Sequence, residues 1–183
     1  MAIHPDLKSL LRESIREYLE VAEYCVAYRK EILWGEAQIG GCLGCPAGVM
    51  LFSIVDTIGS FHRGRTDLRI EVDGKPVAIR RNGFQHFFIL NSEYYGQGLD
   101  ERSLRKLYDN FRSLLVHNAS LAPEHGLMNN PSISMPFPVN GLIQYVNLQP
   151  FLEASRGAVQ LFLDRLDYLV PDSDQAKNIS LKR

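Results

Sequence analysis

Apolar residues recur at helical spacing over most of this chain, and this pattern constrains the fold more than any other feature of the sequence. In the clearest stretch, residues 100–118, the apolar positions recur at i, i+3, i+4 and i+7: Leu104, Leu107, Tyr108, Phe111, Leu114 and Leu115. Such spacing lines up apolar side chains along one side of an α-helix. The stretch therefore predicts an amphipathic helix, with Asp100 before it as a candidate N-cap.

The same reasoning predicts four more helices. A long amphipathic helix covers residues 6–33, and a mostly buried one covers residues 47–62. An aromatic-rich helix spans residues 84–95, and a last amphipathic helix spans residues 151–169. Because helices dominate and strands are too few for a central sheet, the pattern favours a helical bundle.

Two short segments have the alternating pattern of strands. Polar and apolar residues alternate on both sides of Asp73-Gly74, and an Asp-Gly pair between such runs is typical of a β-hairpin. The stretches 132–137 and 142–148 flank a second candidate turn at Asn140-Gly141. We therefore predict a mainly α fold, a bundle of about five helices with two small β-hairpins inserted.

Length and composition limit the domain organisation and the class of protein. The chain has 183 residues, a length typical of one domain. We expect a helical domain over residues 1–171, with hairpin insertions at 64–82 and 131–149, and a polar tail at 172–183. The net charge of −1 argues against a broad nucleic-acid surface, so any contact with RNA or DNA would be local.

The sequence predicts a cytoplasmic protein that does not contact the membrane. Three cysteines cannot all pair within one chain, which favours reduced thiols. The first residues lack the basic and apolar regions of a secretory signal. The longest apolar run is interrupted by polar residues, among them Asp56, and is too polar to span a bilayer.

An arginine followed five positions later by a histidine occurs twice in the chain. The first instance, Arg81 to His86, begins at the end of a predicted strand and contains Gly83. The second, Arg112 to His117, lies in the last turns of the strongest amphipathic helix. The helical setting favours the second instance as the functional motif, while the first remains open.

With Leu107-Tyr108 before it and a loop, a hairpin and a final helix after it, the second instance resembles the HEPN superfamily over most of the chain. These are helical domains of prokaryotic toxins, antiviral systems and RNA-processing nucleases. The resemblance implies a metal-independent endoribonuclease of a bacterial defence or toxin–antitoxin system, without a cofactor. Arg112 would hold the scissile phosphate and His117 would transfer a proton while the ribose 2′-hydroxyl attacks. The resemblance also implies a homodimer, with RNA and an antitoxin or other protein as further partners.

Helix geometry separates the two motif residues. Positions five apart differ by about 140° around a straight helix axis. Arg112 and His117 should therefore flank the apolar stripe, and their convergence would need fraying near Asn118 or a two-fold partner. Ser113 stands where the family often has asparagine. In the structural alternative, Arg112 pairs with Asp109 or Tyr108, and His117 interacts with the helix dipole.

Asp56 is the candidate supporting residue from another helix. It belongs to a narrow polar stripe in the apolar stretch 47–62. A mostly buried carboxylate needs a partner, and Arg112 is a candidate. With Ser113, Asp109 and Asn118, Asp56 completes the set of supporting residues, although the sequence favours a structural contact of Asp56 with an arginine or with the backbone.

Two other patterns carry alternative functions. Arg63, Arg65, Arg80 and Arg81 make the first hairpin and its flanks locally basic, as in a weak nucleic-acid contact. The pair of Cys42 and Cys45 has redox spacing and could form half of a zinc site, although no second pair is present and no metal is predicted. Two alternatives to the ribonuclease therefore remain. One is a non-catalytic dimeric module that binds RNA or nucleotides or serves assembly; the other is a helical protein with a redox or zinc-binding CxxC.

Overall fold

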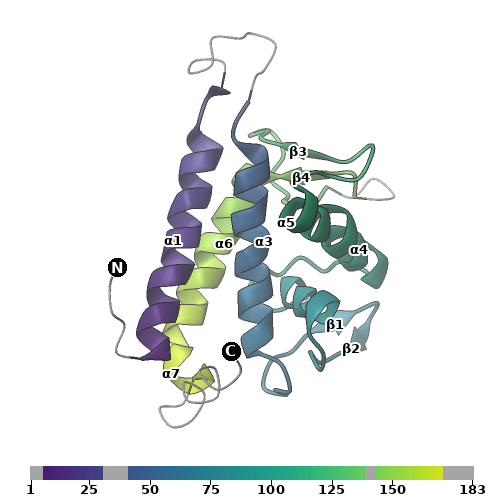
Figure 1. Ribbon diagram of the computed structural model, residues 1–183. Helices are drawn as coiled ribbons and strands as arrows, with labels where there is room; N and C mark the ends of the chain where they lie inside the picture. The colour runs from purple at the N-terminus through teal and green to yellow at the C-terminus, as the bar shows by residue number, and fades with distance from the viewer. Residues whose placement is uncertain (1–5, 31–40, 139–142, 171–183) are drawn as a thin grey trace.

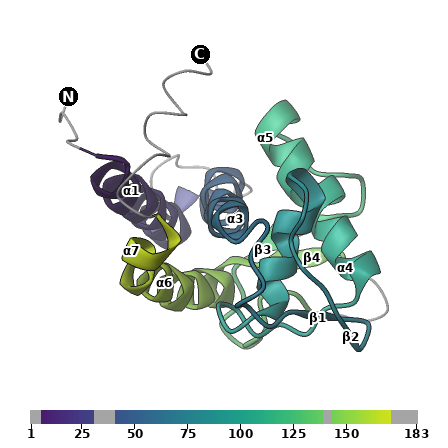
Figure 2. The ribbon, with the colours of Figure 1, turned by 90° about the horizontal axis from the view of Figure 1, so that it is seen from below.

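The computed structural model describes residues 6–30, 41–138 and 143–170, which form a mainly helical fold with two small β elements (Figure 1). Three long helices, α1 (Leu7–Ala27), α3 (Gly44–Phe61) and α6 (Leu148–Asp164), pack against one another. The helical segments between α3 and α6, together with both β elements, lie on the side of α3 away from α1 (Figure 2). The predicted helical bundle with small β elements is confirmed.

Helix α1 begins where the sequence places a cap and ends earlier than expected. The carboxylate of Asp6 accepts a hydrogen bond from the backbone N–H of Ser9 at 2.7 Å, which satisfies one of the free donors of the first turn. The helix ends at Ala27 because Tyr28 has an extended backbone. The prediction that this helix continues to residue 33 is therefore wrong for residues 28 and 29, and residues 31–40 lie outside the described part.

Helix α3 is the centre of the fold. It packs against α1, α6 and η1 (Gly83–Asn91), and eight of its residues are buried. By length and composition alone this helix could cross a membrane, so the expectation that the stretch is too polar to span a bilayer is wrong. Its packing inside the bundle accounts for its apolar character without a bilayer. Helix α3 comes very close to η1 at Gly59, where an added Cβ would lie 2.3 Å from the carbonyl oxygen of His86.

Segment η1 corrects one prediction. Residues 84–95 were expected to form an α-helix, but residues 83–91 form a 3₁₀ helix and the chain turns at Ser92. Five consecutive residues, 86–90, are buried. These residues therefore lack the alternation of buried and exposed positions, with a period of 3.6 residues, that marks an amphipathic α-helix. Tertiary packing against α3 therefore decides its local geometry.

The predicted helix 100–118 is present as one continuous path with a π-helical middle. It comprises α4 (Glu101–Lys106), the π segment η2 (Leu107–Ser113) and α5 (Leu114–Asn118). Asp100 is its N-cap, as predicted, and accepts from the N–H of Ser103 at 2.7 Å. Ala119, in the left-handed conformation, ends it.

The two β elements differ in their outcome. Strands β1 (Glu71–Val72) and β2 (Lys75–Pro76) form the predicted antiparallel hairpin. Both turn residues, Asp73 and Gly74, have positive φ, as a tight hairpin turn requires. The prediction of a second hairpin at residues 131–149 is wrong. Strand β4 (Tyr145–Asn147) pairs in parallel with β3 (Gly126–Met128) instead.

The side chain of Asn147 explains why residues 132–137 are not a strand. Its amide nitrogen donates to the carbonyls of Asn130 and Ile133, and its amide oxygen accepts from the N–H of Asn130. These bonds hold the loop before β4 in place of a ladder of backbone hydrogen bonds. The candidate turn Asn140-Gly141 lies outside the described residues.

The last predicted helix is divided in two. Helix α6 begins at Leu148, three residues before the predicted start, and ends at Asp164. After Arg165 a single turn, α7 (Leu166–Leu169), follows. Phe151 of α6 contacts the ring of Phe52 of α3, with centroids 5.1 Å apart, so this helix closes the aromatic core.

Candidate functional site

Three side chains from three separate elements meet beside α3. Asp56 of α3 accepts from Nδ1 of His86 on η1 through Oδ1 at 2.6 Å, and from Nη2 of Arg112 on η2 through Oδ2 at 2.6 Å. We call these three residues the Asp56 network. It combines the histidine of the first arginine–histidine motif with the arginine of the second.

The network holds an ionised carboxylate. Burial by itself would raise the pKa of Asp56, but the hydrogen bond from His86 and the charge and hydrogen bond of Arg112 outweigh it and lower that pKa. An ionised carboxylate can only accept hydrogen bonds, so Nδ1 of His86 must be the donor to Asp56. When the imidazole of His86 is neutral, its other nitrogen, Nε2, is then an acceptor. Nε2 of His86 and Nε of Arg112 are buried and have no hydrogen-bond partner among the described residues.

The backbone brings these groups together through close packing and an irregular helix. The missing Cβ of Gly59 lets η1 lie directly on α3 one turn after Asp56. Arg112 belongs to the π segment η2, a helix form that is frequent at functional sites. Its guanidinium carbon lies 5.6 Å from the ring centre of Tyr108.

The structure separates the two residues of the preferred motif. Arg112 is directed to α3, with its side chain 21% exposed, whereas His117 is exposed at the end of α5. No hydrogen bond or ion pair between them occurs in the described part of the chain. Of the other predicted supporting residues, Asp109 and Asn118 are exposed and Ser113 is half-buried. The partner that the structure gives to Arg112 is therefore Asp56.

His86 is the residue that sequence reasoning did not place in the site. It was considered only as the end of the alternative motif that begins at Arg81. The two residues of that motif also separate, because Arg81 is exposed while His86 is 6% exposed. The available signal was a histidine inside a buried aromatic run, together with the need of Asp56 for a second partner.

The four basic residues predicted at the hairpin divide into two groups. Arg63 bonds to the side chain of Asn82, and Arg65 pairs with Asp67 at 3.2 Å. The side chains of Arg80 and Arg81 are exposed. No ion pair to either of them occurs among the described residues.

Burial of two of the three cysteines disfavours redox chemistry at the pair of Cys42 and Cys45. Burial raises the pKa of the Cys25 and Cys42 thiols, and Cys45 is exposed. A raised pKa lowers the thiolate fraction, so burial makes Cys42 a poor nucleophile. Among residues 6–30, 41–138 and 143–170, no three His, Cys, Asp or Glu side chains are grouped to hold a metal ion.

Comparison with known protein families, curated proteins and solved structures finds no match to this chain. The chemistry of the site therefore rests on its geometry. The guanidinium of Arg112 keeps N–H donors that Asp56 does not take, and such donors can bind an anion.

Proposed function

We propose that this protein is a HEPN-like, metal-independent endoribonuclease whose site is completed in a homodimer. The observation that carries the proposal is the fixed position of Arg112. Asp56 takes a donor on Nη2 at 2.6 Å, and a guanidinium has five N–H donors in a rigid fork. The side chain is 21% exposed, and in this proposal the N–H groups that Asp56 does not take bind a phosphate of RNA.

The two histidines near Arg112 have different roles in this proposal. His86 is 6% exposed and its Nδ1 is bound to Asp56, so it cannot exchange a proton with a substrate at the surface. It is a positioning residue, as is Asp56. His117 is exposed at the end of α5 and is free to act as the acid and base.

The reaction follows from these roles. The ribose 2′-oxygen attacks the adjacent phosphorus while a His117 imidazole accepts the 2′-hydroxyl proton. Arg112 stabilises the charge on the phosphoryl oxygens. The bond to the 5′-oxygen breaks, and that oxygen takes a proton from a His117 imidazolium. The products are a 2′,3′-cyclic phosphate and a 5′-hydroxyl end.

The dimer follows from the separation within one chain. Because Arg112 and His117 lie on different sides of the same helical path, a two-fold partner would bring the histidine of one copy towards the arginine of the other. We place such a dimer in the cytoplasm, in a bacterial defence or toxin–antitoxin system, with an antitoxin or another protein as its regulator.

The test is cleavage of RNA by the purified full chain in EDTA. We expect metal-independent cleavage that falls by about 10²–10⁴-fold in His117→Ala. His125→Ala is the matched control, since His125 is bound to Asn110 at 3.1 Å and has no role in the proposal. Circular dichroism checks that both variants fold. Cleavage that survives in His117→Ala, or that requires a divalent metal, overturns the proposal.

A second candidate is the non-catalytic dimeric module that binds RNA or nucleotides or serves assembly. The observation in its favour is the ion pair between Asp56 and Arg112. A structural ion pair of this kind neutralises the arginine and needs no role in catalysis. In that case the wild-type chain binds RNA and leaves it intact in the same assay.

A further inference from the structure

Two arginine–aromatic pairs lie next to each other on the helical path that carries Arg112. The guanidinium carbon of Arg105 lies 4.1 Å from the ring centre of Phe84, and that of Arg112 lies 5.6 Å from the ring centre of Tyr108. The two rings touch edge to face, with centroids 6.2 Å apart. Arg105 and Arg112 are therefore linked through Phe84 and Tyr108 into one continuous surface.

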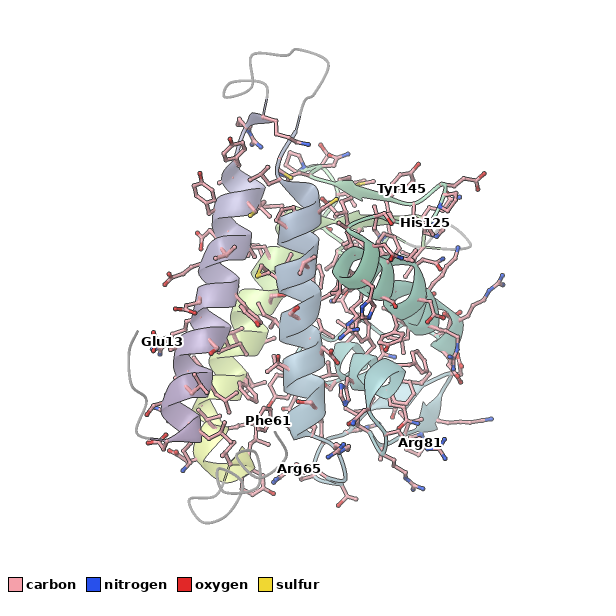
Figure 3. The ribbon with its side chains drawn as sticks, in the orientation of Figure 1. Glu13, Phe61, Arg65, Arg81, His125 and Tyr145 are labelled. Atoms are coloured by element: carbon pink, nitrogen blue, oxygen red, sulfur yellow. The ribbon has the colours of Figure 1, made fainter. Side chains whose placement is uncertain are left out.

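Arg80 and Arg81 extend this surface. They precede η1, and their backbone N–H groups donate to the side-chain oxygen of Gln85 at 2.9 and 2.8 Å. Two residues later, a Cβ on Gly83 would lie 3.0 Å from the hydroxyl of Tyr108, so this end of η1 adjoins the two arginine–aromatic pairs. Figure 3 shows Arg81 at the outer edge of the molecule, on the side away from Glu13 of α1.

The charge on this surface is only partly compensated. Arg105 pairs with Glu101 at 3.3 Å, but both side chains are 54% exposed, and such a pair is weak in water. Arg80 and Arg81 have exposed side chains and no ion pair in the described ranges. By contrast, Arg65 and Arg69 at the hairpin pair with Asp67 and Glu71.

We propose that Arg80, Arg81 and Arg105 bind the phosphate backbone of single-stranded RNA and lead it to Arg112. We call these three residues the entry surface. Three cations on a chain with a net charge of −1 suit a short strand, since each contacts one phosphate, whereas a duplex presents a much larger footprint. The choice of RNA as the ligand rests on the proposed function.

The test measures binding and cleavage separately. Binding is followed by fluorescence anisotropy of a labelled 2′-O-methyl RNA of about 12 nucleotides, which cannot undergo 2′-oxygen attack, from about 50 to 200 mM salt. The variant is Arg80→Gln/Arg81→Gln. The matched control, Arg16→Gln/Arg29→Gln, removes the same charge from residues on and just after α1, on the opposite side of α3. Cleavage is measured with unmodified RNA in EDTA.

The expected result is specific to the entry surface. Each lost contact with a single strand lowers the slope of log K against log salt by about 0.7, so the double variant should lose about 1.4. We take the electrostatic contribution to the binding free energy to vanish near 1 M salt. A slope lower by about 1.4 then corresponds to binding about 25-fold weaker at 0.1 M salt. The control should stay within about twofold of wild type, and adding Arg105→Gln to the double variant should weaken binding further.

Other results would overturn one proposal and not the other. Equal weakening by both double variants, or tighter binding of duplex DNA through the same residues, overturns the entry surface. The same holds if the wild type does not bind the RNA. Binding that depends on Arg80 and Arg81 without any cleavage in EDTA supports the entry surface and overturns the ribonuclease. If the wild type cleaves RNA in EDTA and Arg80→Gln/Arg81→Gln binds RNA as tightly as wild type, the ribonuclease is supported and the entry surface is overturned.

Discussion

Replacing Gly59 by alanine tests the packing that places His86 beside Asp56. In the middle of a helix, an alanine normally stabilises relative to glycine by about 1 kcal/mol. At this position the new Cβ would lie 2.3 Å from the carbonyl oxygen of His86 and 2.7 Å from its Cα and Cβ. Two of these three atoms are backbone, so a rotamer change cannot relieve the contact. Segment η1 must move away from α3 by about 1 Å to restore van der Waals distance.

The expected cost follows from that displacement. Overpacking a close-packed core costs about 1–3 kcal/mol, and a clash with backbone belongs at the upper end of this range. After the gain in helix propensity, Gly59→Ala should lower the free energy of unfolding by about 2 kcal/mol. For a chain of this size, this corresponds to a melting temperature lower by about 4–8 °C.

A second glycine offers a matched control. Gly157 lies inside α6, is exposed, and a Cβ there would meet nothing within 4 Å. Gly157→Ala should therefore raise the free energy of unfolding by about 0.5–1 kcal/mol. Gly48→Ala should fall between the two, since its contact at 2.9 Å is with the end of the flexible Leu115 side chain. Urea unfolding and calorimetry measure all three.

The refuting result is a Gly59→Ala protein that is as stable as Gly157→Ala or more so. That outcome would mean that η1 does not lie against α3 at His86. The same movement should also weaken the hydrogen bond between His86 and Asp56, because adding about 1 Å to 2.6 Å takes it beyond hydrogen-bond distance. Under the proposed function, RNA cleavage by Gly59→Ala should therefore be reduced even at temperatures where the variant is fully folded.

Two other predictions concern groups outside the Asp56 network. Burial lowers the pKa of His62 to about 4, so its contribution to stability is complete above its unfolded pKa of about 6.5 and is lost as the pH falls towards 4. We expect about 2 kcal/mol to be lost between pH 7 and 5, measured by urea unfolding. An equal loss in His62→Gln would contradict this. In the native protein, Ellman's reagent should modify one thiol rapidly, and Cys45→Ser should abolish that phase, since Cys25 and Cys42 are buried. A second rapid thiol would show that the CxxC pair is accessible.

The long helices could be predicted because they are amphipathic. The stripe in residues 104–115 has one buried side and one polar side, and Asp100 has the chemistry of a cap, so local sequence and packing agree. The hairpin at Asp73-Gly74 was predictable for the same reason, because its turn needs two residues that tolerate positive φ.

The elements that were predicted wrongly are those whose conformation or pairing is determined by tertiary contacts. Residues 86–90 are all buried, so their hydropathy has no period from which to distinguish a 3₁₀ helix from an α-helix. The parallel pairing of β3 with β4 joins segments 19 residues apart in register, and no turn signal marks such a pair. The hydrogen bonds of Asn147 to the loop before it have no local sequence pattern either.

The site was predictable in part through the cost of burying charge. A carboxylate in an apolar helix requires a partner, which was enough to link Asp56 to Arg112 across 56 positions of sequence. The same reasoning could not identify His86. A histidine in a buried aromatic run is compatible with many partners, and the close approach that selects Asp56 depends on Gly59, whose role is visible only in three dimensions.

The Asp56 network contains one residue from each of the two arginine–histidine motifs. Two copies of one short motif occur in the chain, yet the structure joins the histidine of one copy to the arginine of the other through a carboxylate from a third element. Spacing along the chain therefore does not define the pair that meets in space within one chain. Arg112 is held by Asp56 of α3, while His117 is exposed at the end of α5. Under the proposed function, a second copy of the chain completes the site that uses both residues, so the oligomeric state and the cleavage activity should be lost or retained together.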